Sequence, residues 1–297
     1  MKTRAGRRGF LAASAAAAWG GLAARLGAAE PFARPGRPSF RLSLAAYSFR
    51  DSFRDPDKLD MFRFVDYCAE QGIPGAELTS YYFPEDADEA YFLKLRRYAY
   101  LRGIGISGTA VGNNFALPEG EERDREIAGV KGWIDRAAVL GAPHIRVFAG
   151  RAQGAGEAEA RNLCVNALEE CCDYAGKKGI FLGLENHGGI VAEADGLLEI
   201  VQAVRSPWFG VSLDTGNFHT TDPYGDLARC APYAVNVQVK VEMRARGGER
   251  EAADMDRIAG ILRAAAYQGY VALEYEAEED PWVAVPRHLK ELAAALG

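Results

Sequence analysis

The sequence is poor in cysteine, and its cysteines follow no pattern that would predict a disulfide framework or a zinc site. The five cysteines among 297 residues are Cys68, Cys164, Cys171, Cys172 and Cys230. Four of them fall in stretches of helical periodicity, at spacings that match neither a zinc ribbon nor paired disulfides. We therefore expect them to be free thiols in the interior.

The sequence also lacks an apolar run of the roughly 20 residues that a membrane-spanning helix needs. The alanine-rich stretch 9–24 is shorter and only weakly hydrophobic. Four cations precede it and small residues follow it: Lys2, Arg4, Arg7, Arg8, and then Gly27-Ala28-Ala29. This layout is typical of a cleaved export signal, and Arg7-Arg8 followed by Gly9-Phe10-Leu11 resembles a twin-arginine signal. We expect residues 1–29 to be removed on export to the periplasm, without stable membrane insertion.

Positive charge is scarce in the remainder of the chain. The whole sequence has 35 Lys and Arg against 41 Asp and Glu, which gives a formal net charge of −6. Residues 1–29 hold five of the cations and none of the anions, so the chain that follows has a net charge of about −11. A protein this acidic lacks the long-range attraction that a phosphate backbone requires. We therefore expect no nucleic-acid partner.

From residue 41 onward, short apolar runs alternate with amphipathic stretches of helical period. The eight apolar runs, each expected to be a strand, are 42–47, 75–78, 104–111, 144–148, 180–184, 209–213, 235–241 and 270–273. The expected helices begin near Lys58, Asp88, Glu122, Glu157, Glu193, Asp222, Glu251 and Pro281. Glycines between a helical stretch and the next strand are expected to take the left-handed conformation that ends a helix: Gly72, Gly103, Gly141, Gly179 and Gly269.

Eight strand–helix units imply a parallel sheet with right-handed crossovers. An open, doubly wound sheet is the alternative. The count of eight, the length of the remaining chain and the lack of a glycine-rich phosphate loop after the first strand favour the closed (β/α)8 TIM barrel, of about 250 residues. We expect one such α/β domain over residues 41–297, with the Pro- and Arg-rich residues 30–40 as a linker.

Oxygen-bearing side chains follow four consecutive strands of this barrel. They are Glu185, Asp214, Gln238 and Glu274. A TIM barrel carries its reacting groups at the carboxyl ends of its strands, so these tips should meet. Burying three carboxylates together is costly unless a cation neutralises them. An all-oxygen ligand set favours Mn²⁺ or Mg²⁺ over zinc. A structural ion pair or a solvated loop charge is the alternative for each single acid.

The runs LENHGG (184–189), SLDTGN (212–217), VNVQVK (235–240) and GYVALEYE (269–276) resemble the sugar phosphate isomerase/epimerase family, which has the xylose isomerase-like TIM-barrel fold. The resemblance extends over residues 41–297 and implies a Glu-Asp-His-Glu metal site. By position the ligands fall on Glu185, Asp214, Gln238 and Glu274. Gln238 replaces the family's usual His and would coordinate more weakly, and Asn217 replaces a substrate-binding His. A substrate preference different from that of the family's ketose 3-epimerases is therefore expected.

The mechanism that the resemblance implies is proton transfer through an enediolate. A metal would polarise the carbonyl of a small ketose or related sugar, while Glu185 removes the adjacent proton and Glu274 returns it. Return to the opposite face gives epimerisation, return to the neighbouring carbon gives isomerisation, and loss of a β-hydroxyl gives dehydration. The residues do not choose among these outcomes.

Several other polar residues near the strand ends are candidates for contacts with the sugar. We expect substrate binding by His187, Asn217, Lys240 and Arg146. Glu77 is a further candidate contact, and Glu276 competes with Glu274 for the acid/base role because alternate residues of a strand face the same side.

Two other functions stay open at the level of sequence. One is a dehydratase or lyase that acts on 3-keto sugars or glycosides with the same site, and the other is a non-catalytic sugar-binding barrel whose metal site has decayed at Gln238. A multi-metal endonuclease is disfavoured because the chain has only 4 histidines. A retaining glycoside hydrolase is disfavoured as well. It would need two carboxylates about 5 Å apart and no metal, and three acids with a glutamine fit that requirement poorly. The sequence leaves the oligomeric state open, a homo-oligomer included.

Overall fold

The computed structural model describes residues 29–154 and 156–297, so nearly all of the expected export signal lies outside the described residues. Eight parallel strands close into a barrel in the order β1-β10-β7-β6-β5-β4-β3-β2. Their bounds are β1 Ser39–Ala45, β2 Gly75–Thr79, β3 Gly105–Ala110, β4 His144–Val147, β5 Phe181–Glu185, β6 Phe209–Asp214, β7 Ala234–Val239 and β10 Gln268–Leu273. All eight expected strands are present, and the predicted (β/α)8 TIM barrel is confirmed.

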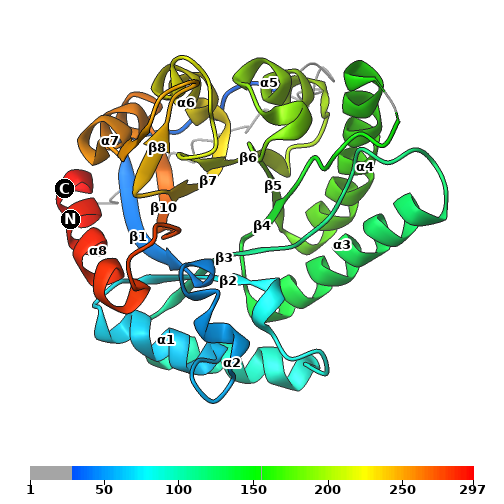
Figure 1. Ribbon diagram of the computed structural model, residues 1–297. Helices are drawn as coiled ribbons and strands as arrows, with labels where there is room; N and C mark the ends of the chain where they lie inside the picture. Colours follow the sequence, from blue (N-terminus) through cyan, green and yellow to red (C-terminus); the bar gives the residue numbers. More distant parts are fainter. Residues whose placement is uncertain (1–28, 155) are drawn as a thin grey trace, which may run out of the picture.

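Eight α-helices surround this ring of strands in the described residues (Figure 1). Their bounds are α1 Met61–Glu70, α2 Glu89–Leu101, α3 Glu121–Leu140, α4 Glu157–Lys178, α5 Ala194–Ala203, α6 Pro223–Cys230, α7 Met255–Ala264 and α8 Pro281–Leu296. Aspartates at N-caps accept from the first turn of several helices; Asp60, for example, accepts from the backbone of Arg63. No helix of the described chain is both long and apolar enough to cross a membrane.

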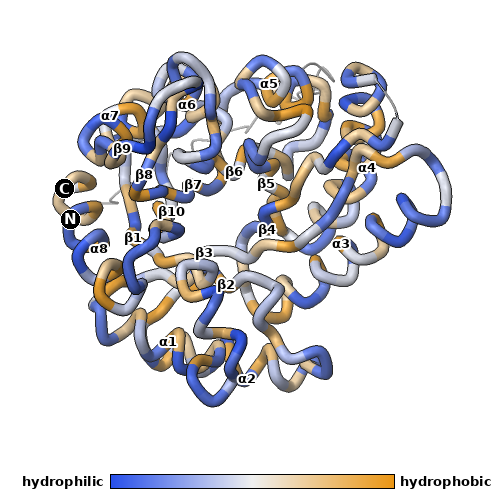
Figure 2. The backbone as a smooth tube through the Cα atoms, viewed as in Figure 1, coloured by the Kyte–Doolittle hydropathy of each residue, from blue (hydrophilic) through white to orange (hydrophobic). Residues whose placement is uncertain are grey.

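The core lies between the strands and the inner faces of the helices. The tube in Figure 2 shows the helices changing along their length between hydrophobic and hydrophilic residues, as helices covering a barrel must. All five cysteines fall in described parts of the chain, where they are buried and free, which confirms the expectation for them. Burial raises the pKa of Cys171 and of Cys230 to about 12, so these thiols stay protonated and unreactive.

The segment between β7 and α7 differs from the expectation. A helix was expected to begin near Glu251, but residues 242–252 form an antiparallel hairpin of β8 (Glu242–Arg244) and β9 (Arg250–Ala252). Gly247 in its turn has a φ of 74°, which glycine adopts without strain. The helix then begins at Met255, capped by the Asp254 carboxylate. The many charged residues of the hairpin hide the apolar–polar alternation that predicts a strand. The sequence therefore predicted the start of the helix about four residues before Met255, where it begins.

Four of the five glycines expected to end helices have the left-handed conformation: Gly72, Gly103, Gly141 and Gly179. The expectation for Gly269 is wrong. After α7 it is Ala266 that has a positive φ, of 51°. Gly269 instead lies in β10, where a Cβ atom would be 2.7 Å from the Tyr267 hydroxyl. Close approach of a side chain, and not a turn, is what requires glycine there.

Residues 30–38 pack against the amino-terminal ends of the strands. Phe32 contacts the ring of Phe181 at the start of β5 edge-on, with ring centroids 6.3 Å apart. The Arg34 guanidinium donates to the carbonyl of Ala234 at the start of β7. The Gln268 amide at the start of β10 donates to the carbonyl of Pro35 over 2.6 Å. This segment therefore covers the floor of the barrel, opposite the end that carries the predicted site.

Candidate active site at the carboxyl ends of the strands

The four predicted oxygen ligands meet at the carboxyl end of the barrel. Glu185 ends β5, Asp214 ends β6, Gln238 lies near the end of β7, and Glu274 directly follows β10. The pairing of neighbouring strands places these residues at a similar height in the barrel. Asp214 pairs with Gln238, and the backbone amide of Glu274 donates to the carbonyl of Val239 over 2.9 Å. None of the four residues is more than 6% exposed. Three carboxylates are therefore buried at the same end of the barrel.

A backbone brace joins the ends of β5 and β6. The Asn186 side chain donates to the carbonyl of Asp214 and accepts from its amide, each over 2.9 Å. The Asp214 Oδ1 atom accepts from the backbone of Gly216 over 2.8 Å. Asn186 thus fixes the strand ends that carry Glu185 and Asp214. Sequence reasoning gave it no role, although it lies directly between the candidates Glu185 and His187.

Both carboxylate oxygens of Glu185 are bound by other side chains. The Arg146 Nε atom lies 2.8 Å from Oε2, and the Asn217 amide donates to Oε1 over 2.8 Å. Arg146 is itself buried, donates to the carbonyl of Val111 over 2.9 Å, and stacks 3.9 Å from the centroid of the Phe148 ring. Burial raises the pKa of Glu185, while the Arg146 charge opposes that rise. Arg146 and Asn217, both expected to bind substrate, therefore contact Glu185.

Lys240 lies among the acids of β6 and of the segment after β10. Its Nζ atom is 2.5 Å from Glu274 Oε2, 2.8 Å from Glu276 Oε1 and 3.2 Å from Asp214 Oδ2. Burial alone would lower the pKa of Lys240, but the charges of these three acids raise it well above its ordinary value. The ammonium is therefore charged. Of the two rival acids, Glu274 is buried and Glu276 is exposed.

A second polar layer lies below the strand ends. Glu77 of β2 is fully buried and accepts from the amides of Asn236 and Gln238, each over 2.7 Å. The Gln238 amide nitrogen also donates to Glu274 Oε1 over 3.3 Å. Burial and the nearby Glu274 charge raise the pKa of Glu77 to about 8. Glu77 therefore contacts the residues of the candidate site, on the side away from solvent.

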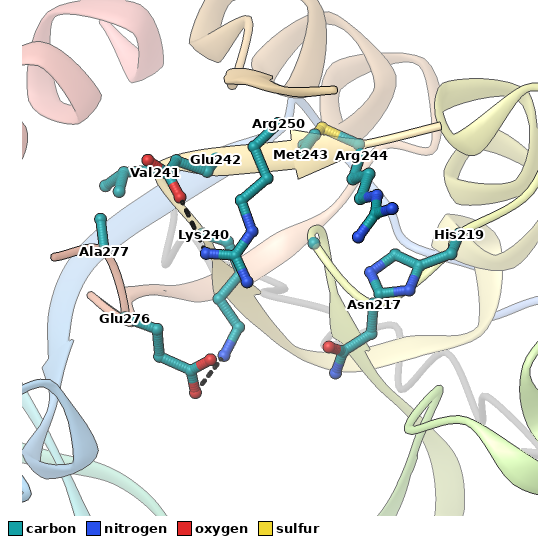
Figure 3. Close-up of a pocket in the computed structure, with 11 residues that line it drawn as sticks. Asn217, His219, Lys240, Val241, Glu242, Met243, Arg244, Arg250, Glu276 and Ala277 are labelled. Carbon is teal, nitrogen blue, oxygen red and sulfur yellow. Dashed lines mark ion pairs between the residues drawn. The ribbon is translucent and has the colours of Figure 1, made fainter. Parts of the chain in front are cut away.

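A cavity of about 190 Å³ opens beside Lys240 and Glu276. Figure 3 shows Lys240 and Glu276 on one side of it and Asn217, His219 and Arg244 on the other, with the β8–β9 hairpin as a wall. Its lining also includes Gly216, Val241, Glu242, Met243, Arg250 and Ala277. His187 is exposed, with its ring 4.6 Å from that of Phe148. The hairpin residues of this wall were missed because the sequence pattern assigned no element to residues 242–250, between the seventh expected strand and a helix expected to begin near Glu251.

Whether the site fits the predicted divalent metal depends on which of its oxygen atoms are free to bind an ion. Among the described residues, the buried atoms Asp214 Oδ2 and Gln238 Oε1 accept no hydrogen bond, which would suit a cation. However, the Lys240 ammonium already contacts both Asp214 and Glu274. No group of three or more His, Cys, Asp or Glu side chains in the described residues is arranged to hold an ion. These residues therefore do not fit a divalent ion while Lys240 lies where it does.

Solved structures share this fold at low sequence identity. A D-psicose 3-epimerase from Clostridium cellulolyticum H10 superposes with a TM-score of 0.70 at 17% identity, with 86% of this chain and 96% of that chain covered. A 3-keto-D-glucoside 4-epimerase from E. coli gives 0.68 at 15% identity, with 86% and 100% covered. A xylose isomerase domain protein from Planctomyces limnophilus gives 0.66 at 16% identity, with 89% and 98% covered.

A search of curated proteins finds no match. The family model described as xylose isomerase-like TIM barrel matches residues 65–292, which is most of the chain. This range contains all four strand ends of the candidate site, together with β2, which carries Glu77. The chain belongs to the xylose isomerase-like TIM barrel family.

Proposed function

We propose that the protein is a sugar isomerase or epimerase that transfers a proton between Glu185, Glu274 and a small ketose or related sugar. The observation that carries this proposal is the pair of buried carboxylates three strands apart in the barrel. Glu185 is held by Arg146 and Asn217, and Glu274 is held by Lys240 and Gln238. Two acids in separate environments can divide the roles of base and acid.

The chemistry follows from the charges around each acid. Burial raises the pKa of Glu185 toward the range in which a carboxylate is an effective general base. Once it removes the proton beside the sugar carbonyl, negative charge develops on the enediolate oxygens. The charged Lys240 ammonium is already oriented at the cavity and stabilises such charge without reorganisation. Glu274 then returns the proton, to the opposite face for epimerisation or to the neighbouring carbon for isomerisation.

Other polar groups would place the substrate. His187 is exposed and lies two residues after Glu185, so it would contact a sugar hydroxyl at the entrance. Arg146 and Asn217 would orient Glu185 and so act on the sugar through it. The predicted Mn²⁺ or Mg²⁺ would have to displace Lys240, and no step of this proposal depends on it. The proposed site of action is the periplasm, after export through the twin-arginine pathway.

The neighbours in structure support this proposal in part and suggest one alternative. Of the three neighbours described above, two are named as epimerases, of D-psicose and of a 3-keto-D-glucoside. The second name suggests a 3-keto glycoside as a substrate class, and the alternative for such a substrate is elimination of a β-hydroxyl or an aglycone by the same acid pair. Both reactions begin with removal of the same kind of proton, so they share the base.

Proton exchange in D2O tests the proposal. Ketoses and 3-keto glycosides are incubated with the protein, and NMR follows deuterium entering the carbon beside the carbonyl. We expect exchange with at least one substrate and a decrease of about 100-fold or more in Glu185→Gln and in Glu274→Gln, because general acid–base catalysis contributes roughly 10²–10⁴-fold. Glu159→Gln, on the exposed face of α4, is the matched control and should exchange normally.

Each other outcome of this experiment has a definite meaning. An elimination product would identify a lyase. Shifts of the sugar signals on binding, with no exchange, would identify the non-catalytic sugar-binding barrel. Exchange that persists unchanged in Glu185→Gln would refute the assignment of the base.

A further inference from the structure

We propose that the Lys240 ammonium is the resident cation of the acidic cluster formed by Asp214, Glu274 and Glu276, and that it occupies the place of a divalent ion. The inference concerns what neutralises the cluster and is independent of which sugar the protein converts. It follows from the position of one side chain in relation to three acids. It also explains why a glutamine at position 238 is compatible with buried acids.

The contacts of Lys240 show a built site. The ammonium lies within 3.2 Å of an oxygen of each acid in the cluster, and the exposed fraction of the Lys240 side chain is 10%. Its backbone amide donates to Thr215 Oγ1 over 3.0 Å, which ties it to the end of β6. Its aliphatic stem packs on Gly216, where a Cβ atom would be only 2.5 Å from the Lys240 Cγ atom. Lys240 is therefore fixed at both ends of its side chain.

A divalent ion and this ammonium exclude each other. An ion that bridges Asp214 and Glu274 would lie about 2.0–2.6 Å from an oxygen of each acid. The Nζ atom of Lys240 is already 3.2 Å and 2.5 Å from oxygens of these two residues. Like charges at such separations repel strongly in a buried site, so the ion could enter only if Lys240 left.

Gln238 completes the arrangement as a donor. Its amide nitrogen points at Glu274 and at Glu77, over 3.3 Å and 2.7 Å. Glu274 thus accepts from Gln238 at Oε1 and from Lys240 at Oε2. A histidine that ligates a metal through one nitrogen has only its other ring N–H to donate, whereas the Gln238 amide donates to both Glu77 and Glu274. The exchange to glutamine is therefore consistent with a cluster that is neutralised by an ammonium.

Metal binding by the full chain tests the inference directly. The protein is purified without added metal, its metal content is measured by mass spectrometry, and Mn²⁺ is titrated by electron paramagnetic resonance at fixed pH and salt. We expect no stoichiometric metal and only weak Mn²⁺ binding in the wild type. In Lys240→Met we expect Mn²⁺ to bind about 100-fold more tightly, because the competing charge is gone and the acids remain. Mn²⁺ should also raise the melting temperature of this variant alone.

Lys178→Met is the matched control, since Lys178 pairs with Asp135 over 2.9 Å on the protein surface, and this variant should bind Mn²⁺ as weakly as the wild type. One Mn²⁺ per wild-type chain with micromolar affinity would overturn the inference, whether or not any variant folds. Unchanged Mn²⁺ affinity in folded Lys240→Met would also overturn it. Failure of the sugar reaction would appear in the D2O exchange and leave this titration unaffected.

Discussion

Replacing Arg146 by methionine would leave the Glu185 carboxylate buried without its main cation. Methionine keeps an unbranched stem of similar length but removes the charge and the donors. The two side chains are 6% and 5% exposed, and their closest atoms are 2.8 Å apart. Solvent therefore screens this pair little, unlike an ion pair on the surface.

The size of the effect can be worked from this geometry. Two unit charges 2.8 Å apart attract by roughly 6 kcal/mol at an effective dielectric constant of about 20. Part of that attraction offsets the cost of burying both charges. Removing one partner of a buried pair leaves the other uncompensated and costs about 3–5 kcal/mol of stability. We expect Arg146→Met to lose this amount and the pKa of Glu185 to rise further.

Urea unfolding of a double-mutant cycle is the assay. Arg146→Met also loses its hydrogen bond to Val111 and its stacking on Phe148, so the single variant alone does not isolate the pair. In the background Glu185→Gln the same replacement should cost about 1–3 kcal/mol less, which lies within the range for coupled neighbours. Additive effects, within about 0.5 kcal/mol, would refute the reasoning. Arg161→Met, whose guanidinium pairs with the exposed Glu199 over 2.9 Å, should cost less than about 1 kcal/mol.

Three further predictions concern the barrel itself. Burial lowers the pKa of His144 from 6.5 to about 4. The contribution of the neutral imidazole to stability is therefore complete above pH 6.5 and is lost as pH falls through 4. Urea unfolding should show this loss, up to roughly 3 kcal/mol, in the wild type and not in His144→Phe. Gly108→Ala would place a Cβ atom 1.8 Å from the His144 ring, and should cost about 1–3 kcal/mol or more in urea unfolding, whereas Gly129→Ala, with open space around it, should not. Ala266→Gly, at a φ of 51°, should raise the free energy of unfolding by about 1 kcal/mol, while Ala128→Gly, at an exposed position inside α3, should lower it by a similar amount.

The sequence predicted the barrel because its signals are local and repeated. Apolar runs that are buried on both faces, helical period between them and glycine after α1 to α4 each depend on neighbouring residues alone. The meeting of Glu185, Asp214 and Glu274 followed from one further rule, since the carboxyl ends of parallel strands share one end of a barrel. The hairpin of β8 and β9 was missed because its alternating charges have no apolar face to reveal a strand.

The partners of the site residues could not be predicted from sequence. Arg146 pairs with Glu185 because β4 and β5 are adjacent in a register that places Arg146 opposite Gly183, two residues before the acid. The sequence places Arg146 in a strand. Whether its side chain meets Glu185 depends on how β4 is aligned with β5, which the sequence does not show. Glu77 is distant in sequence from Asn236 by 159 residues and meets it only across the closed barrel. Closure, which no local pattern encodes, creates these contacts.

The inner face of β7 explains how one barrel end can bury so many acids. Alternation turns Asn236, Gln238 and Lys240 to the same side of the strand, and all three act as donors. Asn236 donates to Glu77 at the lowest level, Gln238 joins Glu77 to Glu274, and Lys240 closes the top. Glu77 of β2 and Glu274 after β10 thus accept from one ladder of donors, which consists of Asn236, Gln238 and Lys240. Lys240 is the charged donor of the three. The ladder accounts for the burial of Glu77 as well as of Glu274, because Asn236 and Gln238 both donate to the Glu77 carboxyl.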